Sequence, residues 1–286
     1  MRRPNDIKKD TEEIETVEDL TSVFESLAST QVAKIKNKVL MSQEFFNLLW
    51  SKYTALRVDD DKRITGGGHQ DNGRNVYVII SAEAGLSGDI DQRLIETVLR
   101  DYDPKTTDIV VLGSHGAQQL MQRGVGYIRY FRVPMTDSYV NVGPVIETIR
   151  PYRHVKVYYE EYISLGAQDI KTIDLIQQIQ TMTKDAPDSA EVISTQETIF
   201  EPSLDEIADI MEEAMLTLAF AQAILESGLA QDASRFNAMA VAKKRAMELV
   251  SQYTLEYHRS KRAENDRRMR EVMISLKRKE RVRTDA

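Results

Sequence analysis

Two short turns hold the residue types that could bind or react with a ligand. Gly85–Leu86–Ser87–Gly88 follows an expected strand and precedes an expected helix, which is where α/β folds bind phosphate groups. Gly113–Ser114–His115–Gly116 has the same position after the next strand. Both lack the three-glycine dinucleotide fingerprint and the Gly-Lys-Ser/Thr sequence of a P-loop. Ser87 also lacks a Gly-x-Ser-x-Gly elbow and an evident histidine partner, so we predict structural turns.

Other reactive groups are absent or scattered. The chain has no cysteine, which excludes disulfides, thiolate zinc sites, iron–sulfur ligation by cysteine and a cysteine nucleophile. Glu12, Glu13, Glu15 and Asp59–Asp61 are interpreted as solvated charge. We therefore expect no catalytic residue, no metal and no cofactor. The histidines do not have the spacing of a metal site; they are His69, His115, His154 and His258.

The composition favours long exposed helices. Of the 286 residues, 29% are charged and only 7% aromatic, and the net charge of -7 argues against a globally basic nucleic-acid binder. The segment from Arg259 to Ala286 nevertheless carries +6, which predicts either a separate partner or a solvated helix end. No apolar run has the length of a membrane span and no signal-peptide core follows the charged start, so an intracellular chain is expected.

A long N-terminal helix is predicted from about Thr11 to Arg57, since no glycine or proline interrupts it. Its apolar positions are expected at Ile14, Val17, Leu20, Phe24 and Leu27, with a change of register near Leu27 and Ala28. From there, a 4-3 spacing predicts a seam against another helix. That seam consists of Ala28, Val32, Ile35, Val39, Ser42, Phe46, Leu49, Tyr53 and Leu56.

A second helix is predicted from about Ser203 to Arg283, roughly 120 Å long. Ser203 is in position to cap it, with Glu206 three residues later. Its seam is expected at Leu204, Ile207, Met211, Ala214, Leu218, Ala221 and Leu225, and then at Phe236, Ala240, Lys243, Met247, Val250, Thr254 and Tyr257. Because this helix is the longer one, it should extend without an intrachain partner from roughly Gln252 onward.

The middle of the chain alternates strand and helix patterns, which predicts an α/β layer with a mostly parallel sheet. The expected strands are Asn75–Ala82, Asp108–Gly113, Tyr127–Val133, Val155–Ser164 and Glu191–Phe200, and the expected helices are Leu86–Tyr102, Ser114–Arg123 and Tyr139–Ile149. The predicted fold is an antiparallel coiled coil of long terminal helices with an inserted Rossmann-like α/β domain. Its parts are a helix at 1–58, a flexible connector at 59–74, the α/β domain at 75–200 and a helix with a basic tip at 201–286.

The order of these elements resembles the gamma subunit, the central-stalk rotor, of F-type ATP synthases. The most specific stretch is Ala233–Met239, which is similar to the family's A-S-R-M-x-A-M. Leu255–Tyr257 follows where the family has L-x-Y. Phe200–Ser203 resembles the family's Y/F-E-P-D/S at the entry to the last helix.

Motifs in the first half of the chain extend the resemblance. Asp108–Gly116 is similar to the family's D-I-x-V-x-G-x-K-G strand and turn. Gly85–Gly88 resembles G-L-C-G with serine in place of cysteine. Ile14, Val17 and Leu20 lie where the family has I-x-S-V-x-N-T, so the resemblance covers nearly the whole chain.

The resemblance implies a non-catalytic rotor subunit that couples proton-driven rotation to ATP synthesis or hydrolysis. The implied partners are the alpha and beta subunits, the epsilon subunit and the c-ring, with no nucleic acid, no cofactor and no direct membrane span. The implied location is cytoplasmic, peripheral on the inner face of the cell membrane. The implied rotor contacts with the catalytic subunits are Arg235, Arg259, Lys261, Arg262, Met269, Met273 and Leu276.

Departures from the family pattern leave other interpretations open. His258, Lys261 and Arg262 stand where family members usually carry Asn, Arg and Gln. One alternative is the rotor of a hydrolysis-only motor related to ATP synthase. A second is a nucleotide-binding α/β protein with a helical dimerisation arm. A third is a coiled-coil adaptor whose basic tail binds nucleic acid, although the tail lacks the interleaved aromatic residues typical of strand binders.

Overall fold

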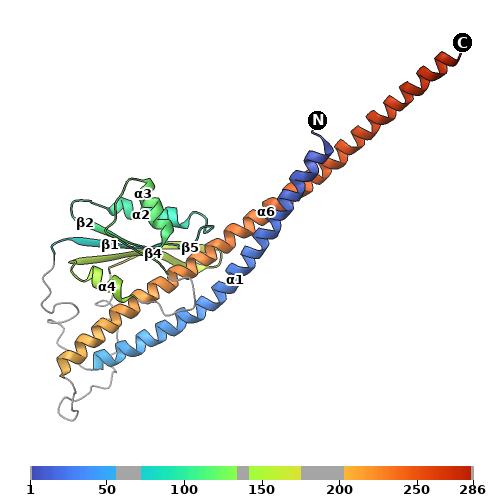
Figure 1. The fold of residues 1–286 in the computed structure, drawn as a ribbon. Helices are drawn as coiled ribbons and strands as arrows, with labels where there is room; N and C mark the ends of the chain where they lie inside the picture. The colour runs from blue at the N-terminus through green and yellow to red at the C-terminus, as the bar shows by residue number, and fades with distance from the viewer. Residues whose placement is uncertain (1, 56–71, 134–141, 175–202, 285–286) are drawn as a thin grey trace. The chain divides into compact units, whose positions relative to one another are not determined.

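The computed structural model describes residues 2–55, 72–133, 142–174 and 203–284 (Figure 1). Two long helices, α1 (Pro4–Ala55) and α6 (Leu204–Thr284), stand at the ends of the chain. Between them, the described residues form five strands and three shorter helices. In chain order these are β1 (Asn75–Ile80), α2 (Ile90–Asp101), β2 (Thr107–Leu112), α3 (Ser114–Gln122), β3 (Arg129–Phe131), α4 (Gly143–Ile149), β4 (His154–Ser164) and β5 (Ala167–Asp174).

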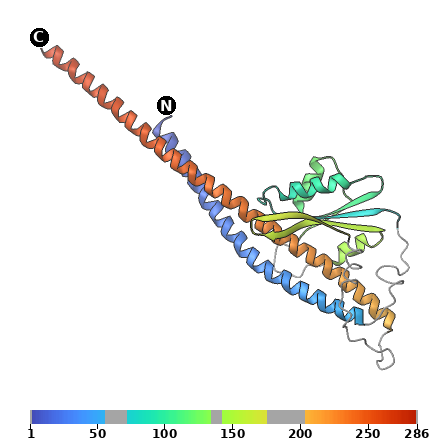
Figure 2. The ribbon, with the colours of Figure 1, turned by 180° about the vertical axis from the view of Figure 1, so that it is seen from behind.

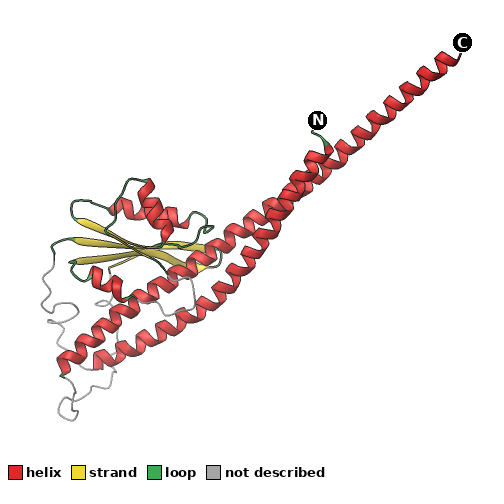
Figure 3. Cartoon of the chain, viewed as in Figure 1, coloured by secondary structure: helices red, strands yellow, loops and turns green. Residues whose placement is uncertain are grey.

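The strands form one mixed sheet in the order β3-β2-β1-β4-β5. The first four are parallel, and β5 pairs with β4 as an antiparallel edge strand (Figure 3). The sheet has an apolar core on each face. One core packs α4 and α6 on Val78, Val157 and their neighbours, and the other packs α2 and α3 on Ile79 and Tyr158. The predicted inserted, mostly parallel α/β layer is therefore confirmed.

The β5 strand is the main element that sequence reasoning missed. It follows β4 after only Leu165 and Gly166, a two-residue hairpin connection. Its exposed and half-buried positions suit an edge strand, which lacks the continuous apolar run of β1 or β2. The predicted strand Glu191–Phe200 and most of the predicted connector at 59–74 lie outside the described residues.

The chain divides into two compact units. The first contains Met1–Ser26 and Ala238–Ala286, and the second contains Leu27–Asn237. Within the second unit, α6 contacts both the sheet and α1. Phe220 and Ile224 join the sheet core, whereas Met215 packs with Phe46 of α1. Figure 2 shows this part of α6 running between the sheet and α1. This two-sided contact explains why much of α6 between residues 214 and 235 is buried or half-buried around its circumference.

Both helix starts have a local chemical cause. Ser203 caps α6 as predicted, because its hydroxyl oxygen accepts a hydrogen bond from the Glu206 amide at 3.3 Å. The first helix begins at Pro4, seven residues earlier than the predicted Thr11. Proline is favoured in the first turn of a helix because its missing N–H needs no partner there.

In α1 the buried positions follow one uninterrupted 4-3 spacing, so the predicted change of register near Ala28 is wrong. In the second unit, the predicted seam from Ala28 to Tyr53 is confirmed. In the first unit, the seam positions are Ile7, Thr11, Ile14, Glu18, Thr21 and Glu25. Four of these six positions carry polar side chains, and the last three are consecutive, which is why hydrophobicity alone misplaced the seam.

The seam of α6 in the first unit is also displaced from the prediction. Lys243, Val250 and Tyr257 are half-buried as expected, but Met247 is 52% exposed and Ala246 is buried in its place. The amino group of Lys243 donates to Glu25 of α1 at 3.1 Å, so a partly buried ion pair occupies the seam. This pair accounts for a polar position on each helix.

Alanine substitution of two neighbouring phenylalanines tests the seam assigned to α1. Phe46 is 3% exposed and packs on Met215, whereas Phe45 is 55% exposed. We expect Phe46→Ala to lower the free energy of unfolding by about 3–5 kcal/mol, because it removes buried surface and leaves a cavity. The matched control Phe45→Ala should change it by less than about 0.5 kcal/mol. Urea unfolding followed by circular dichroism measures both, and equal effects would contradict the assigned seam.

Candidate functional site

The β1–α2 turn is closed by its own side chains. Leu86 and Gly88 both have positive φ, 69° and 71°, and Leu86 is the only non-glycine residue of the described chain in that region. Ser87 is 1% exposed, and its hydroxyl donates to Oδ2 of Asp91 at 2.7 Å. The serine that could have acted as a nucleophile is therefore buried and hydrogen-bonded within the turn.

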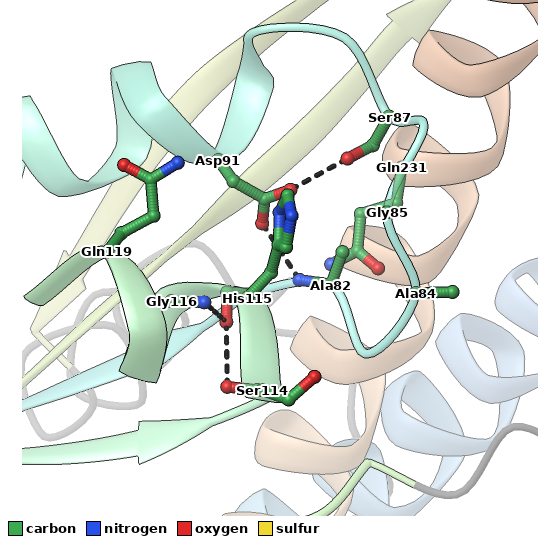
Figure 4. A network of polar contacts seen from close by, with 12 residues as sticks. Ala82, Ala84, Gly85, Ser87, Asp91, Ser114, His115, Gly116, Gln119 and Gln231 are labelled. Atoms are coloured by element: carbon green, nitrogen blue, oxygen red, sulfur yellow. Dashed lines mark hydrogen bonds and ion pairs between the residues drawn. The ribbon is translucent and has the colours of Figure 1, made fainter. Parts of the chain in front are cut away.

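Asp91, in the first turn of α2, joins both candidate turns (Figure 4). It is 1% exposed, and its Oδ1 accepts the Ala82 amide at 2.9 Å. Its Oδ2 lies 3.1 Å from Nδ1 of His115 in addition to the Ser87 hydroxyl. The sequence analysis did not single out this aspartate, although its position three residues after Gly88 was a usable signal.

The β2–α3 turn is equally structural. Gly113 has φ 95°, and a Cβ at this position would lie 2.1 Å from the carbonyl oxygen of Ser81. The hydroxyl oxygen of Ser81 accepts the Gly116 amide at 3.0 Å, while the Ser114 amide donates to Glu83 at 2.9 Å. The first amides of α3 thus have protein acceptors, and both turns are structural, as predicted.

Helix α6 contributes further groups to the β1–α2 turn. Ser234 donates its hydroxyl to the Ser87 carbonyl at 2.6 Å. Arg235 donates to the carbonyls of Gly85 and Ala84, both at 3.3 Å, and pairs with Asp232 on its own helix. The Arg235 side chain is only 16% exposed. Ser234 and Arg235, within the stretch most similar to the family, therefore fix α6 to the sheet domain.

Glu160 of β4 is a buried acid that sequence reasoning missed. It is 0% exposed, and its Oε2 accepts hydrogen bonds from the Ser227 hydroxyl and, at 3.0 Å, from the Gln231 amide of α6. Among the described residues, its Oε1 has no hydrogen-bond partner. Burial, and then the negative charge of Asp91, raise the pKa of Glu160 well above the usual value.

A second polar cluster lies at the opposite, amino-terminal end of β1 and β2. Arg74 donates to both carboxylate oxygens of Asp108, at 3.1 and 2.7 Å, and the Tyr152 hydroxyl donates at 2.9 Å. The Arg74 guanidinium holds the pKa of Asp108 below its usual value, while burial and then Asp108 raise the pKa of Tyr152 to about 12. This saturated arrangement joins the ends of two strands and leaves no group positioned for catalysis.

The exposed surfaces of the long helices differ from these satisfied clusters. Within the first unit, the Ser260 hydroxyl donates to the Arg2 carbonyl at 2.8 Å, and Arg2 lies over the Tyr253 ring. The two helices are therefore paired as far as Ser260, further than the predicted Gln252. Beyond it, α6 continues from Lys261 to Thr284, on the order of 35 Å, and among the described residues no hydrogen bond or ion pair joins this part to another element.

The residues predicted as rotor contacts lie mostly on this surface. Arg259 and Arg262 are exposed, and so is Lys261, whose amino group lies 3.3 Å from the Tyr257 hydroxyl. The apolar residues form a stripe at helical spacing, with exposures of 66% for Met269, 52% for Met273 and 53% for Leu276. Arg235 stands apart, since its guanidinium is bound to the β1–α2 turn.

A further apolar stripe on α1 points away from the seam. The side chains of Val17, Leu20, Val23 and Phe24 are 38–56% exposed in the first unit. The sequence prediction placed Val17, Leu20 and Phe24 on the apolar face, but the seam passes through Glu18, Thr21 and Glu25 instead. Together with the exposed stripe on α6, these residues leave the first unit with apolar surface that no described part of the unit covers.

The comparisons with known proteins agree with this arrangement. A family model described as ATP synthase matches residues 4–274. The chain belongs to the ATP synthase gamma chain family. An ATP synthase gamma chain of Malacoplasma penetrans is 21% identical over 97% of this chain and 99% of the relative. One of Halothermothrix orenii is 23% identical over 96% and 98%.

Solved structures show the same fold. The rotor of the Euglena gracilis mitochondrial ATP synthase matches with a TM-score of 0.61 and 16% identity, covering 91% of this gamma chain and 98% of the solved chain. The central stalk and c-ring structure from Tetrahymena thermophila matches with a TM-score of 0.58 and 14% identity, over 78% and 99%. This gamma chain is thus a non-catalytic, central-stalk subunit.

Two further findings concern metal sites and membrane spans. Within the described ranges, no group of three or more His, Asp or Glu side chains could hold a metal ion. The same part of the chain holds no helix with the length and apolar character needed to cross a membrane.

Alanine substitution at two glycines with positive φ tests the structural role of the β2–α3 turn. Gly113→Ala should be severely destabilising, because the new Cβ would overlap the Ser81 carbonyl in addition to straining the backbone. Gly124 also has positive φ, 71°, but nothing lies within 4 Å of its Cβ position, so Gly124→Ala should cost only about 1–2 kcal/mol. Urea unfolding gives the difference, and similar losses would show that the close approach at Gly113 is unimportant.

Proposed function

We propose that this gamma chain couples proton-driven rotation of a c-ring to ATP synthesis or hydrolysis in an alpha/beta hexamer. One observation carries the proposal: helix α6 extends alone beyond Ser260 with exposed apolar and basic side chains. A fully buried Val, Leu or Met side chain contributes about 1.5–3 kcal/mol, which an isolated helix does not gain. The stripe is thus suited to a surrounding protein.

The proposed mechanism requires asymmetry and no reacting group. A rod with different side chains around its circumference makes different contacts with each of three catalytic subunits. Each angular position is then a difference in binding free energy, and rotation changes nucleotide affinity through the same energy. The shared seam gives the rod its stiffness, and the exposed faces of α1 and α6 give it its asymmetry.

Two sets of residues on α6 would contact the catalytic subunits. Arg259, Lys261 and Arg262 are exposed cations that would meet acidic loops of those subunits. Near the tip, Met269, Met273 and Leu276 would form an apolar bearing, whose non-directional contacts do not fix one rotational position. Because Arg235 is bound to the β1–α2 turn, it would contact a catalytic subunit only where that subunit approaches this turn.

The second unit would face the epsilon subunit and the c-ring. In the helix segment Lys38–Tyr53, Met41 and Phe45 are 70% and 55% exposed, and Leu48 is 55% exposed. Such a stripe fits contact with an apolar protein surface. The segment Ala208–Leu225 of α6 would lie beside it. In this arrangement the gamma chain would be cytoplasmic and peripheral, held on the inner face of the cell membrane by the rest of the complex.

Reversing three charges tests the assigned contacts. We expect simultaneous replacement of Arg259, Lys261 and Arg262 by glutamate to slow ATP turnover at least about tenfold or to uncouple it. The reason is that a rise of about 1.4 kcal/mol in the activation free energy lowers the rate about tenfold. The complex should still assemble because the apolar stripes remain. ATPase activity and proton pumping of the purified complex are the measurements.

The matched control reverses three exposed cations of the α/β part, Arg100, Arg150 and Arg153. It introduces the same change in net charge at a place not assigned to the catalytic subunits. Measured in the complex of the gamma chain with alpha and beta subunits alone, its ATPase activity should remain close to that of the wild type. Normal turnover and coupling in the first variant, or the same loss in the control, would refute the assigned contacts.

Limited proteolysis tests the unpartnered end of α6. In the isolated full-length chain, trypsin should cut first among Lys261, Arg262, Arg267, Arg268, Arg270 and Lys277, because this single helix lacks tertiary contacts and opens easily. Adding alpha and beta subunits should slow these cuts at least about tenfold. Mass spectrometry of the fragments identifies the sites, and equal rates in both states would exclude an enclosed tip.

A further inference from the structure

The carboxyl group of Glu160 lies where the sheet meets α6. It belongs to β4, whose Tyr158 and Glu160 share a sheet face by strand alternation. Tyr158 lies in the core beneath α2 and α3, while Glu160 is near the carboxyl end of the strand and meets Ser227 and Gln231 of α6. The Ser227 hydroxyl also lies 3.4 Å from the Ile80 carbonyl at the end of β1. One buried acid thus contacts the helix at the edge of two parallel strands.

The surroundings of Glu160 favour its neutral form. The side chain is fully buried, and a buried carboxylate is costly unless a cation or several donors stabilise it. Its only described donors reach Oε2, and Oε1 has none among the described residues. The charge of Asp91 adds repulsion, which together with burial raises the pKa of Glu160.

Several charged groups on the elements packed around Glu160 have partners of their own. On α3, His115 contacts Asp91, and on β5, Lys171 pairs with Glu161. On α6, Arg235 pairs with Asp232, and Glu226 accepts a hydrogen bond from the Tyr159 hydroxyl at 3.2 Å. In the described part of the chain, no cationic side chain forms an ion pair with Glu160. Ionisation would therefore place an unbalanced charge in the interior.

We propose that Glu160 is a pH-sensitive switch of the contact between the sheet and α6. When the carboxyl group is protonated, it packs against Ser227 and Gln231 and the contact is closed. When it ionises, the charge must gain water, and α6 moves away from the strand edge to admit it. The helix gives way because β4 is held by ladders to β1 and β5, whereas α6 contacts Glu160 through side chains alone.

The sign of the pH dependence follows from proton linkage. The closed state binds the Glu160 proton more tightly than an open, hydrated state does. The proton on Glu160 stabilises the closed contact. This stabilisation is complete below the ordinary pKa of glutamate and is lost as pH rises through the raised pKa of the closed state. The contact therefore loosens on the alkaline side.

Hydrogen–deuterium exchange of the full-length chain, measured between about pH 6 and about pH 9, tests the switch. After correction for the intrinsic chemical rate, exchange of amides around Ser227–Ser234 should rise by up to about tenfold per pH unit until Glu160 is ionised. Glu160→Gln cannot ionise and should give a level profile. The control Glu161→Gln changes the neighbouring, half-exposed acid and should follow the wild type.

Two outcomes of the exchange experiment would overturn the proposal. A level wild-type profile would show that no proton is linked to the contact. A profile of Glu160→Gln that rises like the wild type would assign the pH dependence to another group, and loss of the rise in His115→Gln would identify His115 as that group.

A direct titration keeps the proposal testable if Glu160→Gln does not fold. The carboxyl carbon of Glu160, followed by carbon-13 NMR in the full chain, should titrate above the ordinary glutamate range of about 4.3. Asp91→Asn removes the nearby charge and should lower that midpoint. A Glu160 midpoint at the ordinary value, or one that Asp91→Asn leaves unchanged, would contradict the switch.

Discussion

A pair of helices can bury only one stripe of each partner, and this constraint organises the gamma chain. In the second unit the shared seam is apolar, with Phe46 and Met215 at its centre. In the first unit it accepts polar residues, including the ion pair between Glu25 and Lys243. Along α1 the 4-3 spacing is kept in both units, and apolar side chains off the seam, such as Val17 and Phe45, remain exposed.

The sequence predicted the fold class well because its signals were strong and local. The strands β1 and β2 are short apolar runs, and α6 has a capping serine and no proline after its start. The antiparallel β5 was missed because its polar edge pattern resembles a loop. The seam of α1 near Thr21 was misplaced because burial there follows the register of the helix pair, which places polar side chains in the seam and leaves Val17 and Leu20 exposed.

The candidate site was predicted less completely. Motif reasoning correctly interpreted the turns at Ser87 and His115 as structural, since neither has the pattern of a phosphate or catalytic loop. It could not find that Asp91 joins them or that Glu160 is buried, because both depend on contacts across the fold. The location of Arg235 against the β1–α2 turn also required tertiary structure. The family-like motif around Arg235 therefore attaches helix α6 to the sheet domain, and it is not evidence of a partner contact alone.

The end of helix pairing at Ser260 also has an elastic consequence. Two helices joined along a seam resist bending and twisting more than one, because material further from the axis contributes most to rigidity. Compliance therefore rises abruptly where α6 continues alone. Under the same load, the part of α6 between Lys261 and Thr284 would therefore bend and twist more easily than the paired section.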